Sequence, residues 1–393
     1  MIKCSLDSQL GIEILEKKKL LFVVNVDWFF ISHRLPIAIE AIKQGYEVHI
    51  ATTITDKLNL LENHGLIVHP LNLNRSGMGV ISIFSEFREI FSIIRSVSPD
   101  LVHLVSIKPV LMGGISARLN RVPAVVSSVS GLGFIFIRNG PISKLIRIVI
   151  SLWFRLCFGH TNQSIIFQNR TDQSQLTQLT GISNKKTVLI HGSGVNLSIF
   201  SNTKPSDSKP VVMLASRLLV DKGVREFVHA AELVKVLAYD VRFILVGEPD
   251  FHYPLSIQQD ELNQWEKDGI VEIWGYRNDM HNVLSIANIV VLPSYREGFS
   301  KVLSEASASG RVVVTTDVPG CRDVIENGVT GLLVPPRNSE ILAKTISLLL
   351  DNPARCIEMG KAGRARAEAM FDVQKVVSKH MRIYEALLDK VSN

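Results

Sequence analysis

The stretch "VVLPSYREGFSKVLSEASASG", residues 290–310, passes from an apolar run into a loop and then into a helical pattern. Its apolar start is typical of a buried strand, and the residues from Pro293 to Gly298 interrupt that pattern. Apolar and small residues then return at helical spacing. A strand, a loop and a helix in this order form one α/β unit.

The same alternation is repeated along most of the chain. Short apolar runs lie at residues 20–26, 47–53, 66–72, 101–106, 124–130 and 163–169, and again at 210–216, 241–247, 271–275, 289–294 and 312–317. Two series of strands that alternate with helices predict an α/β protein with two doubly wound, Rossmann-like domains. Ligands bind beyond the carboxyl ends of such strands, so two domains that face each other would enclose a cleft.

The two series meet at "FSNTKPSDSKP", residues 200–210, where Ser, Pro, Asn and Lys replace the apolar periodicity. A chain of 393 residues is too long for one typical domain. We therefore expect an N-terminal domain over residues 1–203 and a C-terminal domain over 204–370. The pattern of residues 371–393 predicts a closing helix that packs back toward the N-terminal domain.

Composition indicates a globular protein, with 46% hydrophobic and 20% charged residues. Cys4, Cys157, Cys321 and Cys356 are scattered without a metal-binding spacing, which predicts a reducing, cytoplasmic compartment. The first apolar run, "LLFVVNV", is too short for a signal peptide or a membrane span. We expect the protein to remain inside the cell.

Positive charge is concentrated in the first half of the chain. Residues 1–200 hold 20 Lys and Arg against 12 Asp and Glu, and the rest of the chain holds 23 against 25. A basic surface suits an anionic partner, either membrane headgroups or nucleic acid. Since no nucleic-acid-binding motif accompanies it, no nucleic-acid partner is expected.

The segment at residues 138–159, "RNGPISKLIRIVISLWFRLCFG", mixes basic and large apolar residues. Arg138, Lys144, Arg147 and Arg155 are too many charges for a membrane span. The segment is expected either to lie in a membrane interface or to pack half-buried against the sheet. The first alternative predicts a peripheral protein on the cytoplasmic face of the inner membrane.

Two cations follow the strand at residues 210–216. Arg217 and Lys222 lie in "RLLVDKG", a loop that opens a helix, and together they would form an electropositive pocket for a diphosphate. The alternative is a pair of solvated surface cations. The chain has neither a GxxxxGK[ST] loop nor a GxGxxG after its first strand, which argues against an ATPase and a dehydrogenase.

Glu297 and Glu305 lie eight positions apart, so a helix would place them roughly on one face. Taken singly, each is more simply a solvated helix residue. As a pair beside two cations, they suit a ligand with hydroxyls at both ends of a phosphate bridge, because carboxylates accept hydrogen bonds from hydroxyls. A sugar nucleotide is such a ligand.

Further contacts to such a ligand are expected from two loops. The amides of Gly298, Phe299 and Ser300 would face it at the start of the helix, and Tyr276 and Arg277 follow another strand, where they would form a wall for the base. The chain has no Asp-x-Asp, so a metal-bridged diphosphate is not indicated. We expect no metal and no other cofactor.

Three motifs of the second half resemble the donor-binding half of glycosyltransferase family 4, whose members are retaining enzymes of the GT-B fold. They are "SRLLVDKG" (216–223), "PSYREGFSKVLSEASASG" (293–310) and "TTDVPGCRDVIENGVTGLLVPP" (315–336). In the first half, "SHRLPIA" (32–38), "PDLVHLVSIKPVLMGG" (99–114), "SVSGLGFIF" (128–136) and "IFQN" (166–169) resemble a branch that builds bacterial O-antigen, capsule or lipid-linked oligosaccharides.

The resemblance implies a role for each candidate residue. Arg217 and Lys222 would bind the donor diphosphate and help the nucleotide leave, Glu297 and the amides of residues 298–301, including Lys301, would hold the donor sugar, and Glu305 would hold the ribose. The implied donor is a UDP-hexose or UDP-N-acetylhexosamine, and within that class the branch resemblance points to UDP-N-acetylgalactosamine. The implied acceptor is a polyprenyl-diphosphate-linked sugar. No protein nucleophile is expected.

The first half departs from the family pattern at two places. "NVDWFFISHR", residues 25–34, stands where many members have a Gly-Gly loop, and only His103 remains of an "HxH" after the fourth strand. His103 reads more simply as a hydrogen-bonded core residue, although an acceptor role stays open. His33 and Arg34 are the other candidates for the acceptor side, and Lys108 adds positive charge near the cleft.

Two other functions suit the same architecture. One is a sugar-nucleotide 2-epimerase, which needs acid and base groups at the sugar. The other is a non-catalytic subunit that binds a nucleotide sugar and regulates a partner.

Overall fold

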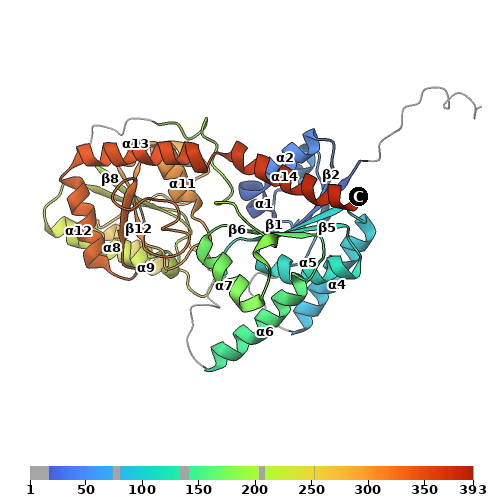
Figure 1. The fold of residues 1–393 in the computed structure, drawn as a ribbon. Helices are drawn as coiled ribbons and strands as arrows, with labels where there is room; N and C mark the ends of the chain where they lie inside the picture. Colours follow the sequence, from blue (N-terminus) through green and yellow to red (C-terminus); the bar gives the residue numbers. More distant parts are fainter. Residues whose placement is uncertain (1–16, 74–79, 133–140, 203–208, 252, 393) are drawn as a thin grey trace, which may run out of the picture.

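The computed structural model describes residues 17–73, 80–132, 141–202, 209–251 and 253–392, which form two α/β domains (Figure 1). The N-terminal domain has a seven-stranded parallel sheet in the order β3-β2-β1-β4-β5-β6-β7. Its strands are β1 (Lys19–Val26), β2 (Glu47–Thr53), β3 (Ile67–Pro70), β4 (Leu101–Val105), β5 (Ala124–Val129), β6 (Gln163–Phe167) and β7 (Thr187–Leu189).

Helices cover both faces of this sheet. One face packs against α1 (Asp27–His33), α2 (Leu35–Lys43), α3 (Leu58–Asn63) and α14 (Val373–Ser392). The other packs against α4 (Val80–Val97), α5 (Ile107–Leu119), α6 (Pro141–Cys157) and α7 (Arg170–Thr180). Because both faces are covered, β4, β5 and β6 are buried along their whole length, including the few polar residues that they contain.

The C-terminal domain repeats the plan with a six-stranded parallel sheet, β10-β9-β8-β11-β12-β13. The strands are β8 (Val211–Ala215), β9 (Arg242–Val246), β10 (Glu272–Ile273), β11 (Ile289–Leu292), β12 (Val312–Thr316) and β13 (Gly331–Val334). The helices are α8 (Val224–Val236), α9 (Gln259–Lys267), α10 (Met280–Ile286), α11 (Lys301–Ala308), α12 (Ser339–Leu350) and α13 (Pro353–Met370). The predicted fold of two doubly wound domains is confirmed; β7 and β13 are strands that we did not predict.

The chain crosses between the domains twice, and the crossings are bonded to each other. The Val195 amide donates to the Phe371 carbonyl at 2.7 Å, and the Val373 amide donates to the Val195 carbonyl at 3.0 Å. From there α14 runs back over the N-terminal domain, where it contacts α2 and β5 (Figure 1). The expected boundary at residue 203 falls on residues 203–208, which lie outside the described residues.

Candidate functional site

The candidate donor residues lie where the strand order of the C-terminal sheet reverses. β8 and β11 are parallel neighbours, but the strands that follow them are added on opposite sides: β9 and β10 beyond β8, and β12 and β13 beyond β11. The carboxyl ends of β8 and β11 therefore border a crevice. Arg217 follows β8, and Glu297 follows β11. The fold thus brings two loops that are far apart in sequence to one place.

Lys222 and Glu297 are in direct contact. Lys222 Nζ donates to Glu297 Oε1 at 2.5 Å, and the Ser294 hydroxyl donates to the same oxygen at 2.9 Å. The Lys222 loop turns at Gly223, which has a left-handed φ of +74°. A Cβ atom at this position would lie only 2.2 Å from the Pro293 carbonyl oxygen, so no side chain fits there. The cation and the carboxylate are each less than one fifth exposed, which strengthens their attraction.

Asp221 is a third acidic residue of this site, which sequence reasoning missed although it precedes Lys222. It is 7% exposed, and its Oδ1 atom has no hydrogen-bond partner among the described residues. Burial raises the pKa of Asp221, Lys222 and Arg217 lower it, and Glu297 raises it further. The charges of Arg217, Lys222 and Glu297 therefore all act on one carboxyl group.

Arg217 lies at the more open side of this group. Its guanidinium donates to Asp250 Oδ2 at 3.0 Å and lies 5.8 Å from the centre of the Tyr253 ring. Its side chain is 44% exposed, so an anionic ligand could compete with Asp250 for it.

Glu305 lies in α11 and is 7% exposed. Lys301 Nζ is 3.6 Å from its carboxylate and also donates to the Ser32 carbonyl at 3.0 Å and the Ser32 hydroxyl at 2.8 Å. Burial raises the pKa of Glu305, and Lys301 partly opposes this. Lys301 therefore joins the second glutamate to α1 of the N-terminal domain.

The loop between Glu297 and α11 is packed on both sides. The Ser300 hydroxyl accepts from the Leu303 amide as the N-cap of α11, whereas the Ser300 amide donates to the Gly320 carbonyl at 3.1 Å. That amide is already bonded, unlike our expectation that it faces a ligand. The Phe299 ring packs 5.3 Å from the Phe371 ring, at the crossing between the domains.

Tyr276 and Arg277 follow β10, as predicted. Tyr276 is 70% exposed. The Arg277 guanidinium forms a bidentate ion pair with the Asp279 carboxylate, with hydrogen bonds of 2.8 and 2.7 Å, and lies 5.7 Å from the centre of the Trp274 ring. Tyr276 thus offers an open aromatic face, and Arg277 is held beside it.

On the N-terminal side, the bulky segment after β1 forms α1. Asp27 is 0% exposed and accepts from its neighbour Trp28, from the amide and hydroxyl of Thr55, and from the Lys57 amide. Its carboxylate fixes the loops after β1 and β2 to each other. A rigid helix thus occupies the place of a glycine-rich loop.

His33 lies at the end of α1, facing the C-terminal domain. Its ring stacks on Phe29 at 4.1 Å, and its Nδ1 is 3.1 Å from the Phe29 carbonyl. Burial, with smaller contributions from Lys301 and Arg34, lowers the pKa of His33 to about 3. At neutral pH the imidazole is therefore uncharged, with Nδ1 as the donor to that carbonyl.

Two of the acceptor candidates belong to the core instead. Arg34 is 2% exposed, and His103 is 0% exposed and bonded to Tyr384 at 2.6 Å and Ser128 at 2.7 Å. Neither has the exposed surface that contact with an acceptor needs, which corrects that prediction. Lys108, the fourth candidate, is paired with Glu86 at 2.7 Å.

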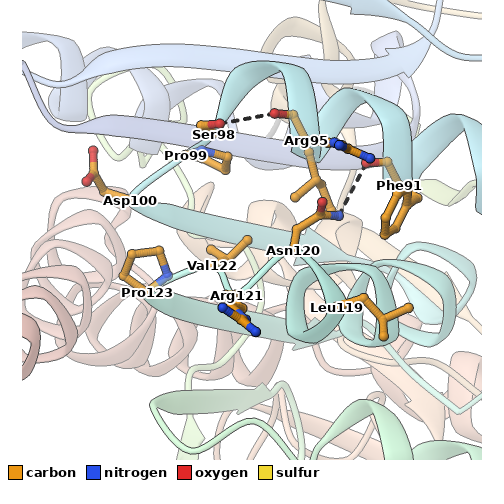
Figure 2. A pocket seen from close by; sticks show the side chains of 11 residues that line it. Phe91, Arg95, Ser98, Pro99, Asp100, Leu119, Asn120, Arg121, Val122 and Pro123 are labelled. Atoms are coloured by element: carbon orange, nitrogen blue, oxygen red, sulfur yellow. Dashed lines mark hydrogen bonds between the residues drawn. The ribbon is translucent and has the colours of Figure 1, made fainter.

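A hollow of about 510 Å³ lies at the opposite edge of the N-terminal sheet (Figure 2). Its walls come from the turns that lead into β4 and β5, and two of its lining residues, Ser98 and Arg121, have left-handed backbone φ angles of +49° and +53°. Because it borders the amino ends of these strands, it is separate from the crevice described above.

The described part of the chain has neither a cluster of metal-ligating side chains nor a membrane-spanning helix. Within those residues, His, Cys, Asp and Glu side chains form no group of three or more that could hold a metal ion. No helix there has the length and apolar character needed to cross a membrane.

Both halves of the chain match known families. Residues 19–169 match the family described as "Glycosyl transferase 4-like", and residues 209–352 match "Glycosyl transferases group 1". The chain is 28% identical to the N,N'-diacetylbacillosaminyl-diphospho-undecaprenol alpha-1,3-N-acetylgalactosaminyltransferase of Campylobacter jejuni, over 92% of this chain and 99% of that protein.

Two more comparisons agree with this one. The UDP-Gal:alpha-D-GlcNAc-diphosphoundecaprenol alpha-1,3-galactosyltransferase of Escherichia coli is 24% identical, over 80% of this chain and 82% of that protein. The crystal structure of a glycosyltransferase from Rickettsia africae superposes with a TM-score of 0.76 at 20% identity, over 95% of this chain and 99% of that one.

Proposed function

The chain belongs to glycosyltransferase family 4 and has the GT-B fold, and from this premise we propose that it moves a hexose or N-acetylhexosamine from a UDP-sugar to a polyprenyl-diphosphate-linked sugar, with retention of configuration. The product would enter a cell-surface polysaccharide such as O-antigen or capsule. The observation that carries the proposal is the contact between Lys222 and Glu297 at the point where the strand order reverses.

In the proposed donor complex this ion pair separates. The diphosphate binds Lys222 and Arg217. The hydroxyls of the donor sugar donate hydrogen bonds to Glu297, and those of the ribose donate to Glu305. As the bond to the sugar breaks, negative charge grows on the departing UDP, and the two cations stabilise it without a metal ion. The remaining rate gain comes from holding donor and acceptor in place.

The acceptor proposal rests on the two relatives from Campylobacter jejuni and Escherichia coli, whose names specify undecaprenyl diphosphate carriers. An acceptor of this kind stays in the membrane, so the enzyme must work at its surface. Val149, Leu152 and Leu156 of α6 are each more than half exposed and form a stripe beside the exposed Arg155. We propose that this stripe lies on the cytoplasmic face of the inner membrane. Lys144, Arg147 and Arg138 of the predicted segment lie where side chains are not described.

The first experiment measures UDP release from a panel of UDP-hexoses and UDP-N-acetylhexosamines, beginning with UDP-N-acetylgalactosamine. Each is incubated with and without a polyprenyl-diphosphate sugar, in the presence of a chelator. We expect release only with the lipid, unchanged by the chelator, and a product whose new bond keeps the donor's configuration. Lipid-independent conversion of the UDP-sugar into its 2-epimer would favour the 2-epimerase, and an inverted product would contradict retention.

The membrane proposal has a separate test. Leu152→Glu with Leu156→Glu should reduce sedimentation with vesicles that contain anionic lipid, because two charges then lie on the apolar stripe. Leu348→Glu, on an exposed position of α12 in the other domain, is the matched control. Equal binding of both variants would contradict the assignment of α6.

A further inference from the structure

The two neighbours of Glu297 in the chain are both bonded to the N-terminal domain. Asn169 Nδ2 donates to the Gly298 carbonyl at 2.7 Å, and the Arg296 guanidinium donates to the Asp172 carboxylate. Asn169 is 0% exposed and Asp172 is 1% exposed. The loop that carries Glu297 is therefore fixed from across the domain boundary.

The backbones of the two domains also touch at this point. A Cβ atom on Gly298 would lie 2.0 Å from the Ser130 carbonyl oxygen, and one on Gly131 would lie 3.0 Å from the Gly298 Cα. No side chain fits between these backbones. Any change in the angle between the domains must therefore move this loop relative to Ser130.

Asn169 is aimed at the loop by its own helix. It is the N-cap of α7, and its Oδ1 accepts from the Asp172 amide at 2.7 Å. Because this bond fixes the side chain, the Nδ2 group points in one direction only. Whether it reaches Gly298 then depends on how closely the two domains approach.

We propose that Asn169 and Asp172 are positioning residues that hold Glu297 against the donor sugar when the domains are closed. They act through Gly298 and Arg296, the two neighbours of Glu297 in the chain. Opening of the cleft breaks both contacts, so Glu297 is correctly placed only in the closed enzyme. This inference rests on the proposed function and adds the N-terminal domain to the donor site.

The test uses Asn169→Ser, which keeps an oxygen for the N-cap but removes the amide donor. We expect kcat to fall by roughly 10- to 100-fold with a higher KM for the UDP-sugar, because a small displacement of a reacting group has effects of this size. Affinity for UDP alone should be unchanged, since its proposed contacts are on the C-terminal domain. Asn338→Ser alters the N-cap of α12, where Oδ1 accepts from the Ile341 amide at 2.9 Å, and should leave all three values unchanged.

Hydrogen exchange gives a readout that does not depend on turnover. Exchange of residues 296–300 should be faster in Asn169→Ser than in the wild type and unchanged in Asn338→Ser. Equal exchange, or unchanged kcat and KM, would overturn the positioning role. Absence of UDP-sugar turnover in the wild type, with faster exchange in the variant, would instead count against the proposed function alone.

A second set of variants tests the ion pair. Asp172→Asn and Arg296→Gln should each lower kcat/KM, and their effects should not multiply in the double variant, because each single variant already loses the contact between Asp172 and Arg296. Multiplied losses in the double variant would overturn the shared role. If Asn169→Ser does not fold, Arg296→Gln carries the same exchange and UDP measurements, since it changes no helix cap.

Discussion

Lys222 and Glu297 are expected to serve turnover more than stability. Lys222→Met should lower kcat about 10²- to 10³-fold, the usual loss when a group that stabilises transition-state charge is removed. It also leaves Glu297, whose side chain is 14% exposed, without its cation, which should lower the melting temperature. Steady-state UDP release and thermal unfolding measure the two effects.

The matched control is Lys222→Met combined with Glu297→Gln. It removes both charges, so the melting temperature should recover while activity stays low. Turnover close to that of the wild type in Lys222→Met would contradict the role of the cation.

Glu305 predicts a pH dependence for donor binding. Because burial raises its pKa, the carboxylate is protonated at a higher pH than an exposed glutamate, and it then loses acceptor capacity for the ribose hydroxyls. The donor KM should therefore rise as pH falls, and Glu305→Gln should show a high KM without this rise. Lys301→Met should shift the rise to higher pH, since Lys301 lowers that pKa. The same acid limb in wild type and Glu305→Gln would contradict the assignment.

At the scale of elements, the loop between β11 and α11 allows a test of the close backbone contact between Gly298 and Ser130. Gly298→Ala should lower kcat, because the new methyl would meet the Ser130 carbonyl and push the loop away from it. Gly45→Ala is the control: it has a φ of +90° and nothing within 4 Å of the added Cβ. It should cost about 1 kcal/mol of stability, from backbone strain alone, and leave kcat unchanged. Equal kcat in both variants would show that the contact is not needed.

Local patterns explain which elements could be predicted from the sequence. The strand, loop and helix of residues 290–310 were visible because apolar periodicity and its interruption are both local. β7 (Thr187–Leu189) and β13 (Gly331–Val334) were missed, and both are strands of three or four residues at sheet edges. Such strands are too short to show a period, and the equally short edge strands β3 and β10 were predicted only from the longer runs of residues 66–72 and 271–275.

Contacts between residues that are far apart in the chain could not be predicted from local patterns of this kind. Lys222 and Glu297 could be assigned to one site in advance, although not as an ion pair, because each follows a recognisable strand of the same sheet. The bond from Asn169 to Gly298 joins residues 129 positions apart in different domains, and no spacing in the sequence reports it. His103 shows the converse case, since its place within an apolar strand already favoured the core.

For the whole molecule, α14 makes the core of the N-terminal domain depend on the far end of the chain. Val376, Met381, Tyr384 and Leu387 are buried in that core, and the Tyr384 hydroxyl bonds to His103 Nδ1. Burial, followed by His380 and Arg34, lowers the pKa of His103 well below its ordinary value, so its ring is neutral and each nitrogen needs a partner.

Tyr384→Phe should therefore destabilise the enzyme by about 1–3 kcal/mol, because a buried ring nitrogen loses its partner while packing is kept. Thermal unfolding should show a lower melting temperature, and kcat measured below that temperature should be unchanged, since Tyr384 lies outside the donor site. Tyr239→Phe is the control, because it removes an exposed hydroxyl that bonds to Asp351 at 2.8 Å. If both variants melt at the same temperature, α14 is attached by its apolar face alone and the His103 bond contributes nothing measurable.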